Sequence, residues 1–241
     1  MTTTGVATFN LDIAELVEEA FERCGKEVRS GYDLKTARRS LNLLTVEWAN
    51  RGINLWTVEE GSIPLVQGTG TYDLPADTID LLEHVVRTGA ATNQSDLTLS
   101  RISAPTYAAI PAKNASGRPI QVWVDRQSGA TYPSNDIPSV PTVMPPRVHV
   151  WPVPDQSNTY TLVYWRLRRI QDAGSGVTTM DIPFRFLNAL VAGLAFYLSM
   201  KLPGVDINRV TGLKAAYDEQ FQLAANEDRE KADARFVPRL R

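Results

Sequence analysis

Apolar side chains recur at helical spacing at both ends of the chain and alternate with polar side chains in its middle. From Ile13 to Cys24 they follow i, i+3, i+4 and i+7 steps and form one stripe. This stripe predicts a helix with Asn10 as its N-cap and Gly25 just past its end.

Three further helices are predicted from the same kind of spacing. A stripe from Leu34 to Trp48 predicts a second helix, capped by Asp33 and ending at Gly52, where a left-handed backbone is expected. From Pro183 to Lys201 the side chains are apolar nearly all round, which predicts a central helix packed on several sides. The last helix starts near Asp206 and presents a single apolar seam.

The middle of the chain, about residues 55–170, predicts strands and turns. Prolines and glycines are frequent there, which is typical of short strands with many turns. The sequence 68–70 predicts a hairpin turn, 103–107 a short helix, 132–146 an exposed irregular loop and 173–176 a linker. The predicted strands are Leu55–Glu59, Ser62–Val66, Thr71–Leu74, Asp80–Arg87, Pro119–Asp125, Arg147–Pro152 and Tyr160–Arg169.

The arrangement of these elements predicts an α+β fold with a discontinuous helical domain. The two N-terminal helices cannot alone enclose the apolar third helix, so both ends of the chain are expected to join in one bundle. We therefore expect residues 1–53 and 177–241 to form a helical bundle domain, with an antiparallel β domain, 54–176, inserted in it.

Composition and charge exclude several classes of protein. The 241 residues are 43% hydrophobic and 22% charged, an ordinary globular balance, and the net charge of −2 argues against a chain that is basic overall for nucleic acid. Cys24 is the single cysteine, so an intramolecular disulfide is impossible, and it is expected as a buried apolar group. The apolar run 189–198 is shorter than the roughly 20 residues of a membrane span, and no signal peptide or membrane association is expected.

The sequence offers little for catalysis. His84 and His149 lie in strand patterns without metal-ligand neighbours, and structural or surface roles are expected for both. The segment 68–70 lacks the rest of a dinucleotide-binding loop, and adjacent carboxylates such as Glu59 and Glu60 point apart. We expect no enzyme activity, no cofactor and no metal. An enzyme would need one of the histidines to meet two carboxylates in a deep pocket.

Two basic segments leave alternatives open. Arg166 and Arg168 share one face of a predicted strand, which is either a solvated edge strand or an arginine ladder facing DNA phosphates or an acidic partner. The C-terminal end is either a disordered tail or a segment that becomes ordered on a partner. Its mixed basic and apolar residues are Arg235, Phe236, Val237, Pro238, Arg239, Leu240 and Arg241.

Several short motifs, taken in order, resemble the head-to-tail adaptors of short-tailed bacteriophages, the tail tubular protein A or gatekeeper-like family. The order of elements agrees along most of the chain, apart from about residues 89–159. The motifs are Ala37-Arg38-Arg39-Ser40-Leu41-Asn42, Asn50-Arg51-Gly52, Trp56 with Glu59-Glu60-Gly61, Tyr72-Asp73-Leu74-Pro75, and Pro183-Phe184-Arg185-Phe186 with Ala189-Leu190.

The resemblance implies a structural virion protein without catalysis or cofactor. Such proteins assemble in the bacterial host cytoplasm as a homo-oligomeric ring, commonly dodecameric, beneath the portal protein. The ring extends the DNA channel used in genome ejection, where double-stranded DNA passes without sequence-specific contacts. It also provides the docking platform for the tail nozzle and, in some phages, fibres. The localisation implied is the virion, at the head-to-tail interface.

On this resemblance we expect the helical domain to form the ring and bind the portal, and the β domain to face the tail. The C-terminal segment from Arg235 to Arg241 is expected to dock on the portal. The expected inter-subunit charge pairs involve Glu15, Glu18, Glu22, Arg38 and Arg39.

Two alternatives remain open. One is a head-completion or tail-terminator protein of another phage type. The other is a β-rich module that binds a host receptor through an exposed cluster among Trp123, Tyr132 and Trp151.

Overall fold

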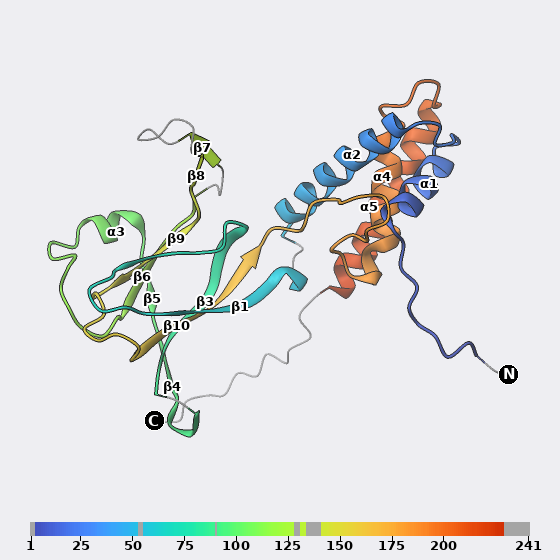
Figure 1. Cartoon of the computed structure of the whole chain (residues 1–241). Coiled ribbons are helices and arrows are strands. Elements are labelled where there is room, and N and C mark those ends of the chain that lie inside the picture. Colours follow the sequence, from blue (N-terminus) through green and yellow to red (C-terminus); the bar gives the residue numbers. More distant parts are fainter. Residues whose placement is uncertain (1–2, 53–54, 90, 128–130, 134–140, 229–241) are drawn as a thin grey trace, which may run out of the picture. The chain divides into compact units, whose positions relative to one another are not determined.

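The fold is α+β, with two compact units (Figure 1). The computed structural model describes residues 3–52, 55–89, 91–127, 131–133 and 141–228. The helical unit consists of residues 1–56 and 170–241, and the β unit consists of residues 57–169. Residues 170–176, expected in the β domain, group with the helices because Ala173 is buried in their core and its N–H donates to Asn42 Oδ1 at 2.7 Å.

The helices of the helical unit are α1 (Ile13–Arg23), α2 (Gly31–Asn50), η3 (Phe184–Phe186), α4 (Leu187–Ser199) and α5 (Ile207–Glu227). Two predicted caps were wrong. Asp12, not Asn10, caps α1, because its carboxylate accepts from Glu15 N while Glu15 accepts from Asp12 N. Ser30, not Asp33, is the N-cap of α2. The left-handed backbone at Gly52 is confirmed, with φ of 77°.

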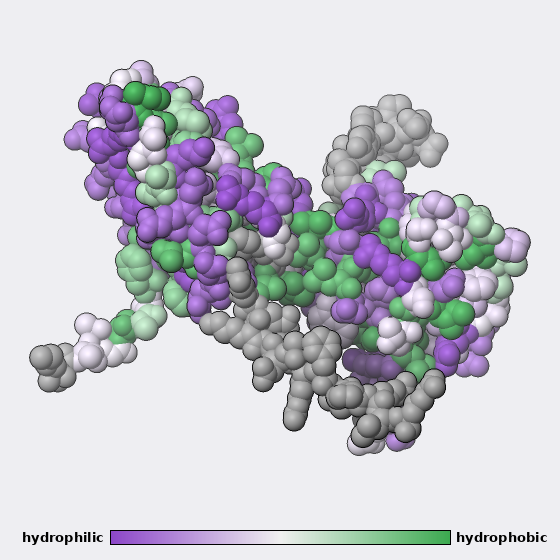
Figure 2. Space-filling view, turned by 180° about the vertical axis from the view of Figure 1, so that it is seen from behind, coloured by the Kyte–Doolittle hydropathy of each residue, from purple (hydrophilic) through white to green (hydrophobic). Residues whose placement is uncertain are grey.

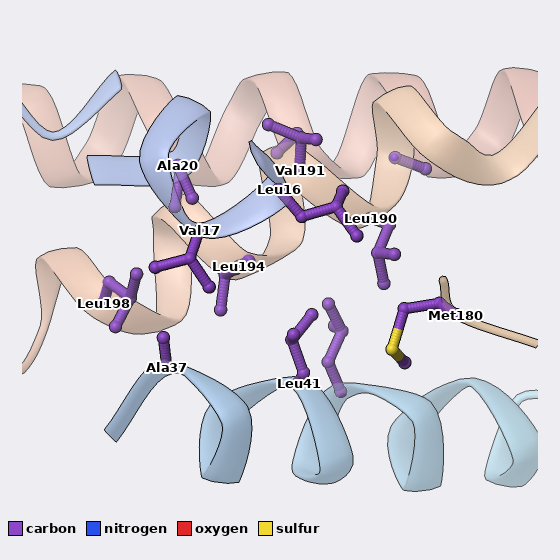
Figure 3. Close-up of a cluster of buried hydrophobic side chains, with 14 of the residues drawn as sticks. Leu16, Val17, Ala20, Ala37, Leu41, Met180, Leu190, Val191, Leu194 and Leu198 are labelled. Atoms are coloured by element: carbon purple, nitrogen blue, oxygen red, sulfur yellow. The ribbon is translucent and has the colours of Figure 1, made fainter. Parts of the chain in front are cut away.

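Helix α4 is the centre of the helical unit. It packs against α1, α2 and α5, which confirms the prediction from its nearly uniform apolar sequence. Figure 3 shows side chains of α1 and α2 entering one cluster from opposite sides, with Leu190 and Leu194 of α4 among them. Gly193 makes this close packing possible, because a Cβ there would lie 2.8 Å from Leu44 Cδ2.

A polar network that reaches from buried Trp48 to the partly exposed Glu47 and Arg51 ties α2, α4 and α5 together. The indole N–H of buried Trp48 donates to the Tyr217 hydroxyl at 2.9 Å, and Tyr217 donates to Glu47 at 3.1 Å. Tyr197 of α4 donates to the other oxygen of Glu47 at 2.6 Å. Arg51 forms an ion pair with Glu47. Each helix therefore supplies at least one member of a continuous hydrogen-bonded chain.

The β unit contains one sheet with strand order β1-β10-β3-β4 and another with order β2-β9-β6-β5. Pairing is antiparallel except between β5 and β6. The strands are β1 (Val58–Pro64), β2 (Thr71–Asp73), β3 (Thr78–Thr88), β4 (Ser95–Thr98), β5 (Ser100–Arg101), β6 (Gln121–Asp125), β7 (Thr131–Pro133), β8 (Pro141–Val143), β9 (Arg147–Trp151) and β10 (Tyr160–Arg168).

Several predictions in this region were wrong. Residues 55–57 form a 3-10 helix (η1, Leu55–Thr57), and the two strands expected between 55 and 66 are the single strand β1. The turn at 68–70 does not close a hairpin, because β1 and β2 pair in different sheets. Strands β7 and β8 pair within the expected irregular loop 132–146, of which residues 134–140 lie outside the described part.

The two sheets share one apolar core. Alternate residues of β6 and β9 are buried, as their alternating sequences predict. The cluster contains Leu81 and Leu162 from the first sheet together with Val122 and Val148 from the second, so the sheets pack face to face. The predicted short helix is confirmed as α3 (Ala104–Ala108), with Ser103 as its N-cap.

Candidate functional site

The predicted arginine pair on β10 lies in a charged cluster within the β unit. Arg166 donates to Glu59 at 2.7 Å and to Asp77 at 2.6 Å, and Arg168 donates to the other oxygen of Glu59 at 2.5 Å. Glu59 and Arg166 are direct cross-strand partners between β1 and β10, so the pairing register brings them together. Each arginine side chain is only 11% exposed.

This pairing changes the interpretation of the two arginines. The expectation of an edge strand was wrong, because β10 lies between β1 and β3 in the sheet. Burial acts to lower the pKa of Arg166, but its hydrogen bonds to Asp77 and Glu59 outweigh burial and raise it. Carboxylates of the same unit thus already pair with the two arginines that the predicted ladder would present to DNA phosphates. A DNA-facing or partner-facing role for Arg166 and Arg168 stays a prediction.

Both histidines lie in packed surroundings. His84 on β3 is buried, and this burial, together with nearby Arg101, lowers its pKa. His149 on β9 has its Nδ1 2.9 Å from Thr71 Oγ1 and stacks on Trp123 with ring centroids 4.5 Å apart. Burial lowers the pKa of His149 as well. The contacts with Thr71 and Trp123 give the His149 ring a structural role in the β unit.

Two of the three aromatic residues considered for receptor binding, Trp123 and Trp151, are engaged within the β unit. Trp123 lies half-buried between His149 and Tyr107 of α3, whose ring centroid is 5.0 Å away. The indole of Trp151 donates to the carbonyl of Ala112 at 3.0 Å. The side chain of Tyr132 lies outside the described residues. The Trp123 ring therefore helps to hold β6, β9 and α3 together by stacking. The Trp151 indole attaches the loop after α3 to β9.

The helical unit carries a groove between α1 and α4 that sequence reasoning did not find. Its volume is about 410 Å³. Leu187 and Val191 of α4 form an apolar floor, exposed Phe9 stands at its side, and a row of carboxylates follows α1. These carboxylates are Glu15, Glu18, Glu19 and Glu22. The spacing of the glutamates was visible in the sequence, but the contribution of Phe9 and α4 depends on tertiary packing.

The predicted inter-subunit residues lie on two separate helices. Glu18 and Glu22 are exposed and form no ion pair among the described residues, whereas Glu15 serves in the cap of α1. Arg38 donates to the carbonyl of Ala173 at 3.2 Å, and Arg39 is exposed on α2. Within the described part of the chain, no ion pair joins these arginines to the glutamates of α1, so their proposed partners would have to come from elsewhere.

The predicted portal-binding residues Arg235, Phe236, Val237, Pro238, Arg239, Leu240 and Arg241 lie outside the described residues. The described part of α5 ends before this segment. Asp228, the last described residue, is held by Arg185 at the start of the α4 region, with Arg185 Nε 3.0 Å from Asp228 Oδ1. The Asp228 side chain is 1% exposed, so this ion pair fixes the end of α5.

Metal-binding clusters and membrane-spanning helices are absent from the part of the chain that the structure describes. No cluster of three or more His, Cys, Asp or Glu side chains among them could hold a metal ion. None of the described helices is long and apolar enough for a transmembrane span. The visible face of the helical unit in Figure 2 is largely hydrophilic, with smaller hydrophobic areas between.

A comparison with protein families gives one match over most of the chain. A family model described as SU10 adaptor protein matches residues 11–239, which include elements of both units. Among curated proteins, none matches the chain.

Proposed function

The chain belongs to the SU10 adaptor protein family, and we propose that it is a head-to-tail adaptor of a bacteriophage virion. The observation that carries this proposal is the match over residues 11–239, which spans the helical unit and the β unit rather than one of them. The role is structural. It needs surfaces that bind other virion proteins, and charged, mixed surfaces are what the helical unit presents.

We propose further that copies of the chain form a ring beneath the portal and continue the DNA channel. In this arrangement the helical unit forms the ring and binds the portal, while the β unit faces the tail nozzle and fibres. A net charge of −2 suits a channel through which DNA slides without being held. Arg166 and Arg168 stay the proposed DNA-facing or partner-facing residues, although their ion pairs with Glu59 and Asp77 reduce the positive charge available to phosphates.

The C-terminal segment is our proposed contact with the portal. The ion pair between Arg185 and Asp228 anchors the end of α5 to the helical unit. Phe236, Val237 and Leu240, set among Arg235, Arg239 and Arg241, combine apolar anchors with charge, as suits a segment that orders on a partner.

Two measurements test these proposals. Electron microscopy of the purified protein with and without portal should show rings or portal-capping particles. A truncation after Asp228 keeps the Arg185 ion pair, so it should stay folded by circular dichroism and lose portal binding. Undiminished portal binding by this truncation would refute the tail contact but not the adaptor role. A protein that stays monomeric and ignores portal would refute the adaptor role itself.

A further inference from the structure

The outward face of α2 carries an exposed apolar stripe with basic residues beside it. Tyr32 is 71% exposed, Leu43 51% and Val46 50%. Lys35 and Arg39 lie between them in sequence and are also exposed. At about 100° per residue these positions fall on one side of the helix, opposite the buried stripe that enters the core. Among the described residues, neither Lys35 nor Arg39 forms an ion pair.

The groove between α1 and α4 has the complementary character. Leu187 and Val191 give it an apolar floor, and Phe9, 76% exposed, stands at its side. Glu18 and Glu22 line the same groove and lack ion-pair partners among the described residues, whereas Arg23 in the lining is paired with Glu19. An apolar ridge with cations beside it would therefore bury its apolar side chains on this floor and pair its charges with the glutamates.

One copy of the chain cannot bring these two surfaces together. In Figure 3, Leu16, Val17 and Ala20 of α1 enter the cluster from the side opposite Ala37 and Leu41 of α2. The outward faces of α1 and α2 lie behind these core-facing residues, so they face away from each other. The complement to each face must come from another molecule.

We propose that the outward face of α2 of one copy docks in the α1–α4 groove of the next copy. This inference rests on the proposed ring, and it names the two faces through which neighbouring copies meet. The contact is heterologous, because each copy offers a different face to each neighbour, and repetition of such a contact closes a ring when the rotation fits. Arg39 and Lys35 pair with Glu18 and Glu22 across the contact, while Leu43 and Val46 cover the floor.

Cross-linking tests the contact between defined positions. The variant carrying Glu18→Cys and Arg39→Cys is treated with a short bismaleimide and examined on a denaturing gel. Native Cys24 is buried and contributes little background. A ladder of dimers and higher species is expected. The matched control combines Glu18→Cys with Lys214→Cys on the exposed side of α5 and should give no ladder. A double variant that gives no more ladder than this control would overturn the proposal.

A charge swap provides the second test, read by sedimentation of the full chain. Lys35→Glu with Arg39→Glu should weaken self-association about tenfold or more, equivalent to ~1.4 kcal/mol. Adding Glu18→Lys and Glu22→Lys to the same chain should restore association, because the pairs are rebuilt with reversed sign. Circular dichroism checks that every variant is folded. Unchanged association in the first variant, or no recovery in the second, would overturn the face assignment. Portal-capping particles formed by those same variants would leave the adaptor role standing.

Discussion

Replacing Tyr217 by Phe should destabilise the helical unit although only one oxygen atom is removed. The Tyr217 hydroxyl accepts a hydrogen bond from the Trp48 indole at 2.9 Å and donates one to Glu47 at 3.1 Å. Trp48 is fully buried, so its N–H loses its acceptor without gaining water. Leaving a buried donor unpaired costs about 1–3 kcal/mol. Glu47 keeps Tyr197 and Arg51, so we expect the total to stay within that range.

Urea unfolding followed by circular dichroism at the helix band measures this cost. Tyr32→Phe is the matched control, because Tyr32 is 71% exposed and the same oxygen is removed there into water. Its effect should be below about 0.5 kcal/mol. A double-mutant cycle with Trp48→Phe should give a coupling energy of about 1 kcal/mol or more. A Tyr217→Phe variant as stable as the control, or a coupling near zero, would refute the role of this hydrogen bond.

Three further predictions concern single positions. Gly52→Ala should cost on the order of 1 kcal/mol in the same urea assay, because φ of 77° is strained for alanine although space for its Cβ is open; a neutral or stabilising effect would contradict this. Arg166→Ala should destabilise the β unit by about 1–3 kcal/mol, whereas Arg147→Ala, from an exposed ion pair, should cost less than ~1 kcal/mol; equal effects in urea unfolding would show that burial of the arginine is unimportant. Burial lowers the pKa of His84, so the unfolded chain binds more protons and the β unit should lose stability as pH falls through about 6.5; His84→Leu should flatten that slope, and an unchanged slope would exclude the contribution.

The helices were predictable because their spacing is strong and their core faces are continuous. Residues from Ile13 to Cys24 and from Ala37 to Trp48 fall where the periodicity puts them. The caps were less predictable, because Asn10 and Asp12 are equally good N-cap residues in isolation. The reciprocal hydrogen bonds between Asp12 and Glu15 make Asp12 the N-cap. The position of an N-cap thus depends on a carboxylate three residues further along the chain. The spacing of apolar residues, from which the helix was predicted, carries no information about that carboxylate.

The strands and surfaces depended more on tertiary contacts. Strands β4 and β5 are too short and polar for a sequence signal, and they exist because β3 and β6 offer them partners. The ion pairs of Arg166 could not be predicted because Glu59 and Asp77 are remote in sequence. The α1–α4 groove likewise requires Phe9 and Leu187 to meet across most of the chain. The Tyr32, Leu43 and Val46 spacing was present in the sequence, but only burial of the opposite face shows that it points outward.

The most direct test of the adaptor role is electron microscopy of the full chain mixed with its cognate portal. The account predicts a ring of this protein seated on one end of the portal, coaxial with its channel. A portal that stays bare while this chain remains monomeric at high concentration would contradict it.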